Sequence, residues 1–176
     1  GVQYNLGTVL GGNGELDCAI TSCKRAISLD PNNAVAHGYL GTALERKGDT
    51  DGAIASYQQA ISLDPNHADA HYNLGIMLNK KGDLDGAISS YKRAISIDPN
   101  VAGVHYNLGT VLGEKGELDG AITSFKRAIS IDPNNAVTHC NLGTALDRKG
   151  DTDGAIASYQ QAISLDPNHT NAHHNL

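Results

Sequence analysis

Histidine is the residue type in this sequence whose number and spacing could most readily do chemistry. Five of the eight histidines are separated from one another by 34 residues: His37, His71, His105, His139 and His173. If that spacing reflects stacked repeats, neighbouring members lie about 10 Å apart, a typical distance between packed helices. Zinc needs its ligands about 2 Å from a single point. We therefore interpret these histidines as structural residues between helices.

Two histidine pairs keep a metal-binding alternative open. His67/His71 and His169/His173 have the i, i+4 spacing that can hold zinc or nickel on one helix face. The first member of each pair falls in a predicted turn, so only adventitious binding is expected there. The sequence predicts no metal site and no cofactor.

Two other motifs resemble parts of ligand-binding loops. The segment Asp83-Leu84-Asp85-Gly86 and its copies lack the third acidic residue and the distant Glu of a calcium loop, so helix capping explains them better. The run Gly11-Gly12-Asn13-Gly14 follows a predicted helix rather than a strand and lacks the Lys-Ser/Thr of a phosphate loop. No serine or cysteine has a base placed beside it by the pattern. We predict no catalytic residue and no enzyme.

Composition and charge exclude several partner classes. The net charge is −6, and Lys and Arg do not cluster, so a nucleic-acid partner is not expected. No stretch approaches 18 apolar residues and no signal-peptide pattern is present, so no membrane segment is predicted. Cys18, Cys23 and Cys140 are odd in number and lack paired spacing, which argues against a disulfide framework. We expect a cytoplasmic protein.

A 34-residue repeat organises the whole sequence. Asp-Pro recurs at this interval, beginning at residues 30, 64, 98, 132 and 166, and Leu-Gly recurs in step with it. An internal period of this length is typical of stacked helical repeats. The predicted boundaries are 1–33 for a first repeat that lacks one residue, then 34–67, 68–101, 102–135 and 136–169, with 170–176 starting a truncated sixth.

Each repeat is predicted to form two helices. In the third repeat, apolar residues recur with a 3.6-residue period at positions 84, 87, 88, 91, 94 and 95. Gly82 is expected to end the first helix with a positive φ, and Pro99 prevents the second from continuing. Asp83 and Asp85 stand where a helix N-terminus favours acidic side chains.

The repeats resemble the tetratricopeptide family. That family's pattern is Trp-x2-Leu-Gly-x2-Tyr, then Ala-x3-Phe, then Pro. The third repeat supplies the matching residues His71, Leu74, Gly75, Leu78, Ala87, Tyr91 and Pro99. His replaces the Trp and Leu replaces the first Tyr, and both changes are tolerable. The resemblance implies an all-α fold, a right-handed superhelical α-solenoid of antiparallel helix pairs.

A second period of 102 residues indicates that three repeats were copied as a block. Residues 34–67 and 136–169 agree at 30 of 34 positions, and residues 1–33 and 103–135 agree at 27 of 33. We interpret the chain as part of a longer array without a capping helix. Ile156, Tyr159 and Ile163 are then expected to be only partly covered by 170–176, which favours end-to-end self-association.

The resemblance also implies a binding face, because the first helices of such arrays line a concave groove. A column of Asn residues on that face can hydrogen-bond an extended peptide backbone, as in the similar repeats of O-linked N-acetylglucosamine transferases. The alternative is that each Asn bonds within its own repeat. The candidate peptide-binding residues are Tyr4, Asn5, Tyr39, Arg46, Tyr72, Asn73, Asn79, Lys80, Tyr106, Asn107, Asn141 and Arg148.

Three functional hypotheses follow. The first is a protein-interaction scaffold that binds an extended peptide or helix in the groove. The second is the substrate-recognition arm of a larger enzyme, such as a glycosyltransferase. The third is a self-assembling structural array that stacks end to end.

Overall fold

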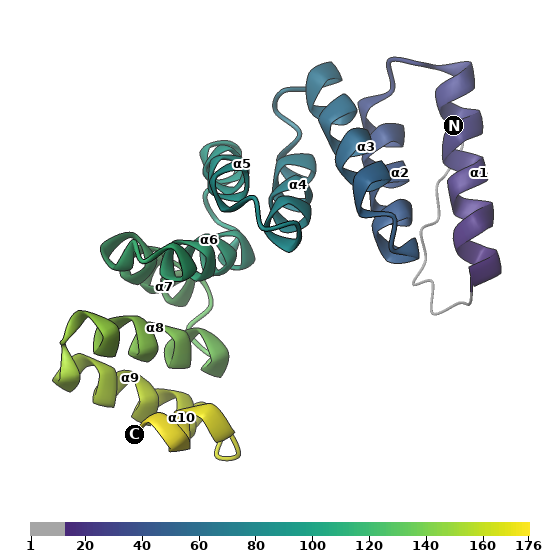
Figure 1. Cartoon of the computed structure of the whole chain (residues 1–176). Coiled ribbons are helices and arrows are strands. Elements are labelled where there is room, and N and C mark those ends of the chain that lie inside the picture. Colours follow the sequence, from purple (N-terminus) through teal and green to yellow (C-terminus); the bar gives the residue numbers. More distant parts are fainter. Residues whose placement is uncertain (1–12) are drawn as a thin grey trace. The chain divides into compact units, whose positions relative to one another are not determined.

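The computed structural model describes residues 13–176, and the described part of the chain is all-α (Figure 1). The helices are α1 (Asn13–Leu29), α2 (Ala34–Lys47), α3 (Thr50–Leu63), α4 (Ala68–Lys80), α5 (Leu84–Ile97), α6 (Ala102–Lys115), α7 (Leu118–Ile131), α8 (Ala136–Lys149), α9 (Thr152–Leu165) and α10 (Thr170–Asn175). Short connections join α2 to α3, α6 to α7 and α8 to α9 into packed antiparallel pairs. The predicted all-α solenoid of helix pairs is therefore confirmed.

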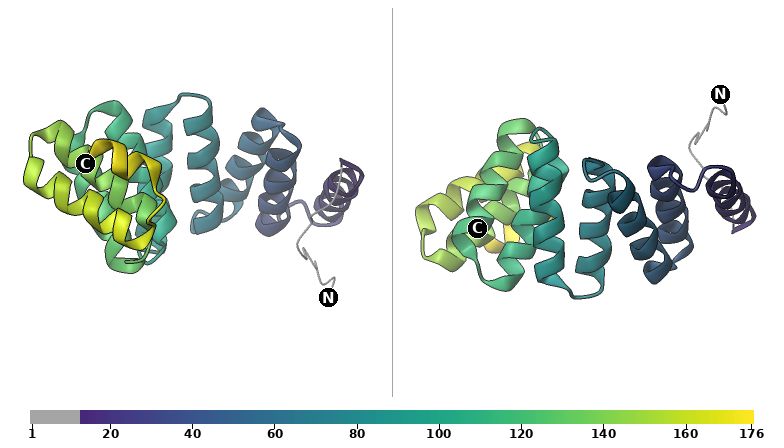
Figure 2. Two further views of the ribbon diagram at one scale, coloured as in Figure 1. Left: turned by 90° about the horizontal axis from the view of Figure 1, so that it is seen from below. Right: turned by 90° about the horizontal axis from the view of Figure 1, so that it is seen from above.

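The described residues divide into two compact units, one up to Met77 and the other from Leu78. Buried Ile20, Cys23, Leu40 and Ala43 join α1 to α2 in the first unit. In the second, α10 packs against α8 and α9 and buries Ala172 completely (Figure 2). No helix of residues 13–176 is both long enough and apolar enough to cross a membrane.

A glycine with a positive φ ends the first helix of each pair. The φ angles are 87°, 82°, 83° and 88° at Gly48, Gly82, Gly116 and Gly150. At Gly82, the backbone N–H donates to Asn79 O over 2.9 Å, and the next N–H donates to Leu78 O over 2.9 Å. These bonds satisfy carbonyls that the helix end would leave without partners. The prediction for Gly82 is confirmed.

Aspartate caps the second helices α3, α5 and α9. The Asp83 carboxylate accepts a hydrogen bond from Gly86 N at 2.9 Å, and Asp85 forms an ion pair with Lys115 at 2.6 Å. The Asp83 bond confirms helix capping as the interpretation of that residue, whereas the Asp85 ion pair joins α5 to α6.

The periodic histidines contact the turn that precedes their own helix. The distance from Nε2 to the carbonyl oxygen of the proline six residues earlier is 3.1 Å in His71 and 3.0 Å in His105, so each ring can donate to that carbonyl. His67 has a different task, since its Nδ1 accepts from Ala70 N at 3.4 Å and caps α4. The periodic histidines thus have structural contacts, but these are with the preceding turn rather than with another helix.

An aromatic ring of the second helix lies flat against the glycine of the Leu-Gly motif. A Cβ placed on Gly41 would lie only 2.6 Å from the ring of Tyr57, and one on Gly143 would lie 2.6 Å from the ring of Tyr159. Tyr159 is only 3% exposed and its ring lies against Gly143 of α8, so the prediction that it would be partly uncovered is wrong. Ile156, at 37% exposed, and the half-buried Ile163 match that prediction.

Candidate functional site

Three of the predicted binding residues line one cavity in the first unit. Tyr39 comes from α2, and Tyr72 and Asn73 come from α4, the first helix of the next repeat. The cavity measures about 520 Å³. Its remaining lining residues are Val35, Gly38, Thr42, His67 and Asp69. Consecutive first helices therefore bring predicted side chains together; we call this space the Tyr72 cavity.

Aromatic and aliphatic surface borders the Tyr72 cavity. The side chains of Val35 and Tyr39 are 52% and 37% exposed, and Tyr72 is half-buried. His67 closes one wall, because a Cβ on Gly38 would lie 3.2 Å from its Nε2. Tyrosine offers apolar area with a polar tip at a small entropic cost, which suits contact with another protein.

A hydroxyl cluster lies behind this cavity. The Tyr57 hydroxyl donates to Glu45 Oε2 at 2.8 Å and lies 3.3 Å from Thr42 Oγ1, and the Asn73 carboxamide is hydrogen-bonded to the same hydroxyl. Burial raises the pKa of Tyr57 well above its ordinary value, and the neighbouring Glu45 carboxylate raises it further. Tyr57 is therefore a neutral structural anchor.

The Asn column bonds to the preceding repeat. Asn73, from the third repeat, reaches Tyr57 of the second, and Asn141 Nδ2 donates to the Tyr106 hydroxyl over 3.1 Å from the fifth repeat to the fourth. Neither contact is the within-repeat bond of the alternative interpretation. Because a carboxamide has two N–H groups and an oxygen, one such bond leaves it further hydrogen-bonding capacity.

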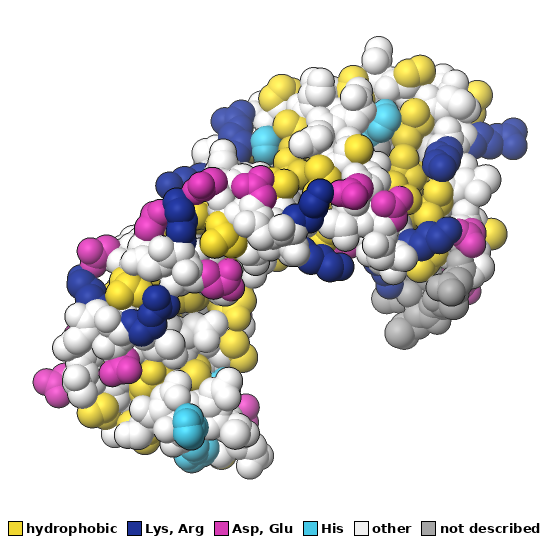
Figure 3. Space-filling view, in the orientation of Figure 1, with side chains coloured by type: hydrophobic (Ala, Val, Ile, Leu, Met, Phe, Trp, Pro, Cys, Tyr) yellow, Lys and Arg dark blue, Asp and Glu magenta, His cyan; other side chains and the backbone are white. Residues whose placement is uncertain are grey.

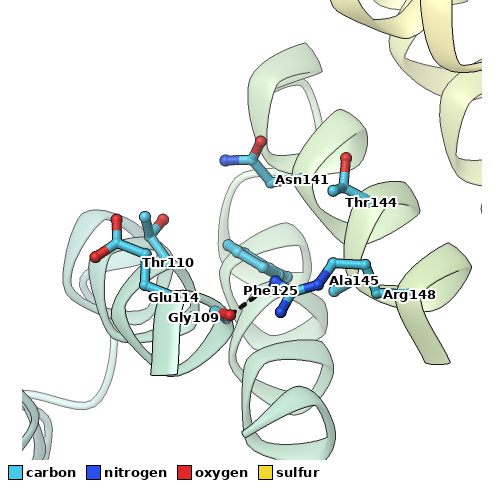
Figure 4. Close-up of a pocket in the computed structure, with 9 residues that line it drawn as sticks. Gly109, Thr110, Glu114, Phe125, Asn141, Thr144, Ala145 and Arg148 are labelled. Atoms are coloured by element: carbon cyan, nitrogen blue, oxygen red, sulfur yellow. Dashed lines mark hydrogen bonds between the residues drawn. The ribbon is translucent and has the colours of Figure 1, made fainter. Parts of the chain in front are cut away.

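A second cavity lies between α6, α7 and α8 in the second unit. It measures about 180 Å³, and the Phe125 ring lies between the helix of Thr110 and Glu114 and the helix of Asn141, Thr144 and Arg148 (Figure 4). Gly109, Gly113 and Ala145 complete the lining. Arg148 Nη1 donates to the carbonyl oxygen of Gly113 at 2.7 Å, shown as a dashed line. We call this space the Phe125 cavity.

The remaining predicted residues occupy several positions. Tyr106 packs against Phe125, with 6.1 Å between ring centroids, and Asn107 is half-buried on α6. Asn79 and Lys80 lie in the last turn of α4, outside the lining of both cavities. Arg46 lines a smaller cavity with Cys23 and Tyr39. Tyr4 and Asn5 fall outside the described residues.

Sequence reasoning missed Phe125 and His67 as cavity residues. Phe125 was not expected to line a cavity because it occupies a core position of the repeat. His67 was not expected to do so because it lies in a predicted turn. A signal for Phe125 does exist, since its counterparts 34 and 68 residues away are Tyr91, Tyr159 and Tyr57. Phe125 is the one phenylalanine at this position, in a series of tyrosines that begins with Cys23.

The distribution of charged side chains does not favour a strongly charged ligand. Acidic and basic side chains are interspersed on the face drawn in Figure 3, without a patch of one sign. Among residues 13–176, no three His, Cys, Asp or Glu side chains come together as a metal site. The arrangement can offer aromatic surface, carboxamides and small cavities to a partner.

Family models match nearly the whole sequence. Models described as tetratricopeptide repeat match residues 4–65, 40–102, 90–123 and 136–169, and one described as TPR repeat matches residues 112–150. No curated protein matches the sequence.

Solved structures of similar fold include two proteins named MamA and YrrB. A MamA structure has 30% identity and a TM-score of 0.83, covering 89% of this chain and 92% of that one. YrrB, described as a TPR protein with an unusual peptide-binding site, has 26% identity and a TM-score of 0.83, with coverage of 92% and 83%. MamA from Desulfovibrio magneticus RS-1 is similar in fold, with 24% identity, a TM-score of 0.81 and coverage of 89% and 88%.

Proposed function

Because the chain belongs to the tetratricopeptide repeat family, we propose that it is a protein-interaction scaffold that holds a peptide segment of a partner against its first helices. The observation that carries the proposal is the Tyr72 cavity. Tyr39, Tyr72 and Asn73, which the resemblance to the family implies as binding residues, line one cavity of about 520 Å³.

The chemistry of the cavity supports a peptide over other ligands. Val35 and the two tyrosines offer apolar contact, Asn73 offers hydrogen bonds, and Asp69 contributes a single negative charge. A site with mixed apolar and carboxamide surface suits a peptide, which has both side chains and backbone amides to satisfy. It lacks the clustered cations that a phosphate backbone would require.

The solved structures add support of a general kind. YrrB is described as having a peptide-binding site, and it shares the fold of this chain over 92% of its length. Use of the first helices for binding is our proposal for this chain, argued from its own residues.

The proposal is tested with a random heptapeptide library displayed on phage and selected against the intact chain. We expect enrichment of peptides that bind with micromolar affinity, about −8 kcal/mol. Binding should be lost in a variant with four alanine substitutions: Tyr72→Ala, Asn73→Ala, Tyr106→Ala and Asn107→Ala. Circular dichroism verifies that helicity is retained.

A matched control changes the same number of exposed side chains on second helices: Gln58→Ala, Gln59→Ala, Lys92→Ala and Lys126→Ala. We expect this control to bind the selected peptides like the unmodified chain. Peptide binding that survives the first-helix variant, with helicity intact, would refute the proposed site.

A self-association surface on α9 is a second proposal, favoured by the exposure of Ile156. Of its counterparts, Ile20, Ile88 and Ile122 are each 8% exposed and Ile54 is half-buried, whereas Ile156 is 37% exposed. Exposed aliphatic surface favours association. Sedimentation of the chain should show a mass that rises with concentration, and Ile156→Glu should abolish the rise. A concentration-independent monomer mass contradicts this proposal.

A further inference from the structure

Two positions in the repeat change together. The first is the aromatic position of the second helix, which holds Cys23, Tyr57, Tyr91, Phe125 and Tyr159 in successive repeats. The second lies near the end of the first helix and holds Gly11, Glu45, Asn79, Gly113 and Asp147. A polar side chain stands at the second position wherever the first is tyrosine. Glycine stands there in the two repeats that lack the hydroxyl.

The structure gives this pairing a physical meaning. In the second repeat, the Tyr57 hydroxyl donates to Glu45 at 2.8 Å, so the two side chains meet between the helices. In the fourth repeat, Phe125 has no hydroxyl and Gly113 has no side chain. The Phe125 cavity, about 180 Å³, lies at this place and is lined by both residues.

The polar groups around the Phe125 cavity already have partners within the chain. The Thr110 hydroxyl donates to Tyr106 O at 3.1 Å, and the Thr144 hydroxyl donates to Cys140 O at 3.2 Å. Asn141 donates to Tyr106, and Arg148 donates to Gly113 O. An apolar guest over the Phe125 ring would therefore leave these hydrogen bonds intact, which keeps the desolvation cost low.

The volume indicates the size of guest that fits. A cavity of about 150 Å³ lined by apolar side chains binds benzene. The Phe125 cavity, at about 180 Å³, is open to solvent and has polar residues in its lining, and its volume is large enough for a phenyl ring or a leucine side chain.

A related cavity recurs one copied block earlier. Cys23, Tyr39, Thr42, Ala43 and Arg46 line a small cavity in the first unit. Each lies 102 residues before one residue of the Phe125 cavity, in order Phe125, Asn141, Thr144, Ala145 and Arg148. The threonine, alanine and arginine are the same in both cavities. Cys23 stands in place of Phe125, and Tyr39 stands in place of Asn141. The copied block has therefore kept the frame of the cavity and altered its depth and polarity.

Charge at the rim indicates what should neighbour the apolar guest. Two exposed charged residues line the Phe125 cavity, Glu114 and Arg148, and the Arg148 guanidinium donates to Gly113 O. Glu114 stands at a position where the adjacent repeats carry Lys80 and Arg148. A carboxylate there is complementary to a lysine or arginine on the bound chain.

We propose that the Phe125 cavity is a side-chain pocket for a peptide partner that presents a phenylalanine or leucine next to a lysine or arginine. This inference rests on the proposed peptide-binding function and specifies its ligand. It assigns Phe125 as the floor of the pocket, Asn141 and Thr144 as its wall, and Glu114 as the charge that selects the basic neighbour.

The test is the phage-displayed heptapeptide library, selected in parallel against the unmodified chain and a filled variant, Phe125→Tyr with Gly113→Glu. The filled variant places at positions 125 and 113 the same pair of residues that the second repeat has as Tyr57 and Glu45. Peptides from the unmodified chain should be enriched in Phe or Leu beside Lys or Arg. Their affinity for the filled variant should fall about tenfold or more, the loss expected when one apolar anchor is excluded.

Two further variants keep this test decisive. Phe125→Tyr alone adds a single hydroxyl, so it reports on the pocket even if the double substitution unfolds the chain. Thr123→Ala with Lys126→Ala changes exposed residues of the same helix α7 and should leave affinity unchanged.

The outcomes separate this inference from the function on which it rests. Enriched peptides that lack the apolar-basic pair, or that bind the filled variant equally well, overturn the pocket and leave peptide binding standing. Failure of any peptide to be enriched overturns both. Loss of affinity in the filled variant but not in the α7 control supports both.

Discussion

The second and fourth repeats have the same two-helix frame but treat the space between the helices differently. In the second, the ring of Tyr57 lies on Gly41 and its hydroxyl is held by Glu45 and Thr42. In the fourth, the ring of Phe125 lies on Gly109 in the same way and a cavity opens beside it. The ring and the glycine are common to both repeats, whereas the hydroxyl and its Glu45 partner are present in the second repeat and absent beside the Phe125 cavity.

The largest effect is expected from crowding the ring. Gly41→Val places side-chain atoms on a ring whose hydroxyl is held and which is 0% exposed, so it should destabilise the protein by about 3 kcal/mol. Gly109→Val should lower the free energy of unfolding by at least about 1 kcal/mol less than Gly41→Val does, because Phe125 can shift into the adjacent cavity. Urea unfolding of the two variants measures both values. Equal losses would contradict the difference in packing freedom.

A smaller effect is expected from removing the hydroxyl. Tyr57→Phe deletes a hydrogen bond to the Glu45 carboxylate and should destabilise the protein by about 1–2 kcal/mol. Tyr159→Phe removes only a contact of 3.4 Å to Thr144 and should lose about 0.5 kcal/mol. Urea unfolding again provides the comparison, and a larger loss at Tyr159 than at Tyr57 would show that Glu45 is not the stabilising partner.

The N-terminal caps of the second helices differ between the same two repeats. Asp49 accepts a hydrogen bond from Gly52 N at 2.9 Å, whereas Glu117 caps α7 without a side-chain bond of this kind. Asp49→Ala should therefore destabilise the protein by about 1 kcal/mol. Glu117→Ala should lose at most about 0.5 kcal/mol, through its surface ion pair with Lys115. Thermal unfolding should rank the two variants in this order.

The smallest effect is the loss of stability that comes from the ionisation of Tyr57, and it is expected only at alkaline pH. Burial raises the folded-state pKa of Tyr57 above its ordinary value of about 10, so the folded protein keeps a proton that the unfolded chain releases. Stability is thus fully present below pH 10 and falls as the pH rises above it. Tyr57→Phe should show a weaker alkaline decline. Parallel denaturant curves at pH 8 and pH 11 measure it, and identical declines would exclude Tyr57 as the cause.

Features set by local backbone chemistry could be predicted from the sequence. Gly82 ends a helix because only a positive φ closes that turn, and Asp83 begins the next because its carboxylate satisfies a backbone N–H. These effects act within about five residues, so a sequence pattern contains them completely. The repeat period then extends the prediction from one helix pair to the others.

The cavities depended on combinations that no local pattern reveals. The Phe125 cavity needs the loss of a hydroxyl on α7 and of a side chain on α6 at the same time. The partners of Asn73 and Asn141 likewise depend on which hydroxyl the previous repeat presents. The burial of Tyr159 likewise depends on Gly143 of the neighbouring helix α8, against which its ring lies.

The most direct test of the central claim is a methyl NMR titration of the intact chain with a selected peptide. We predict shifts in the methyl signals of Thr110, Thr144 and Ala145, which line the Phe125 cavity, and none in that of the exposed Thr123 on α7. Shifts at Thr123 with unchanged signals around the Phe125 cavity would contradict it.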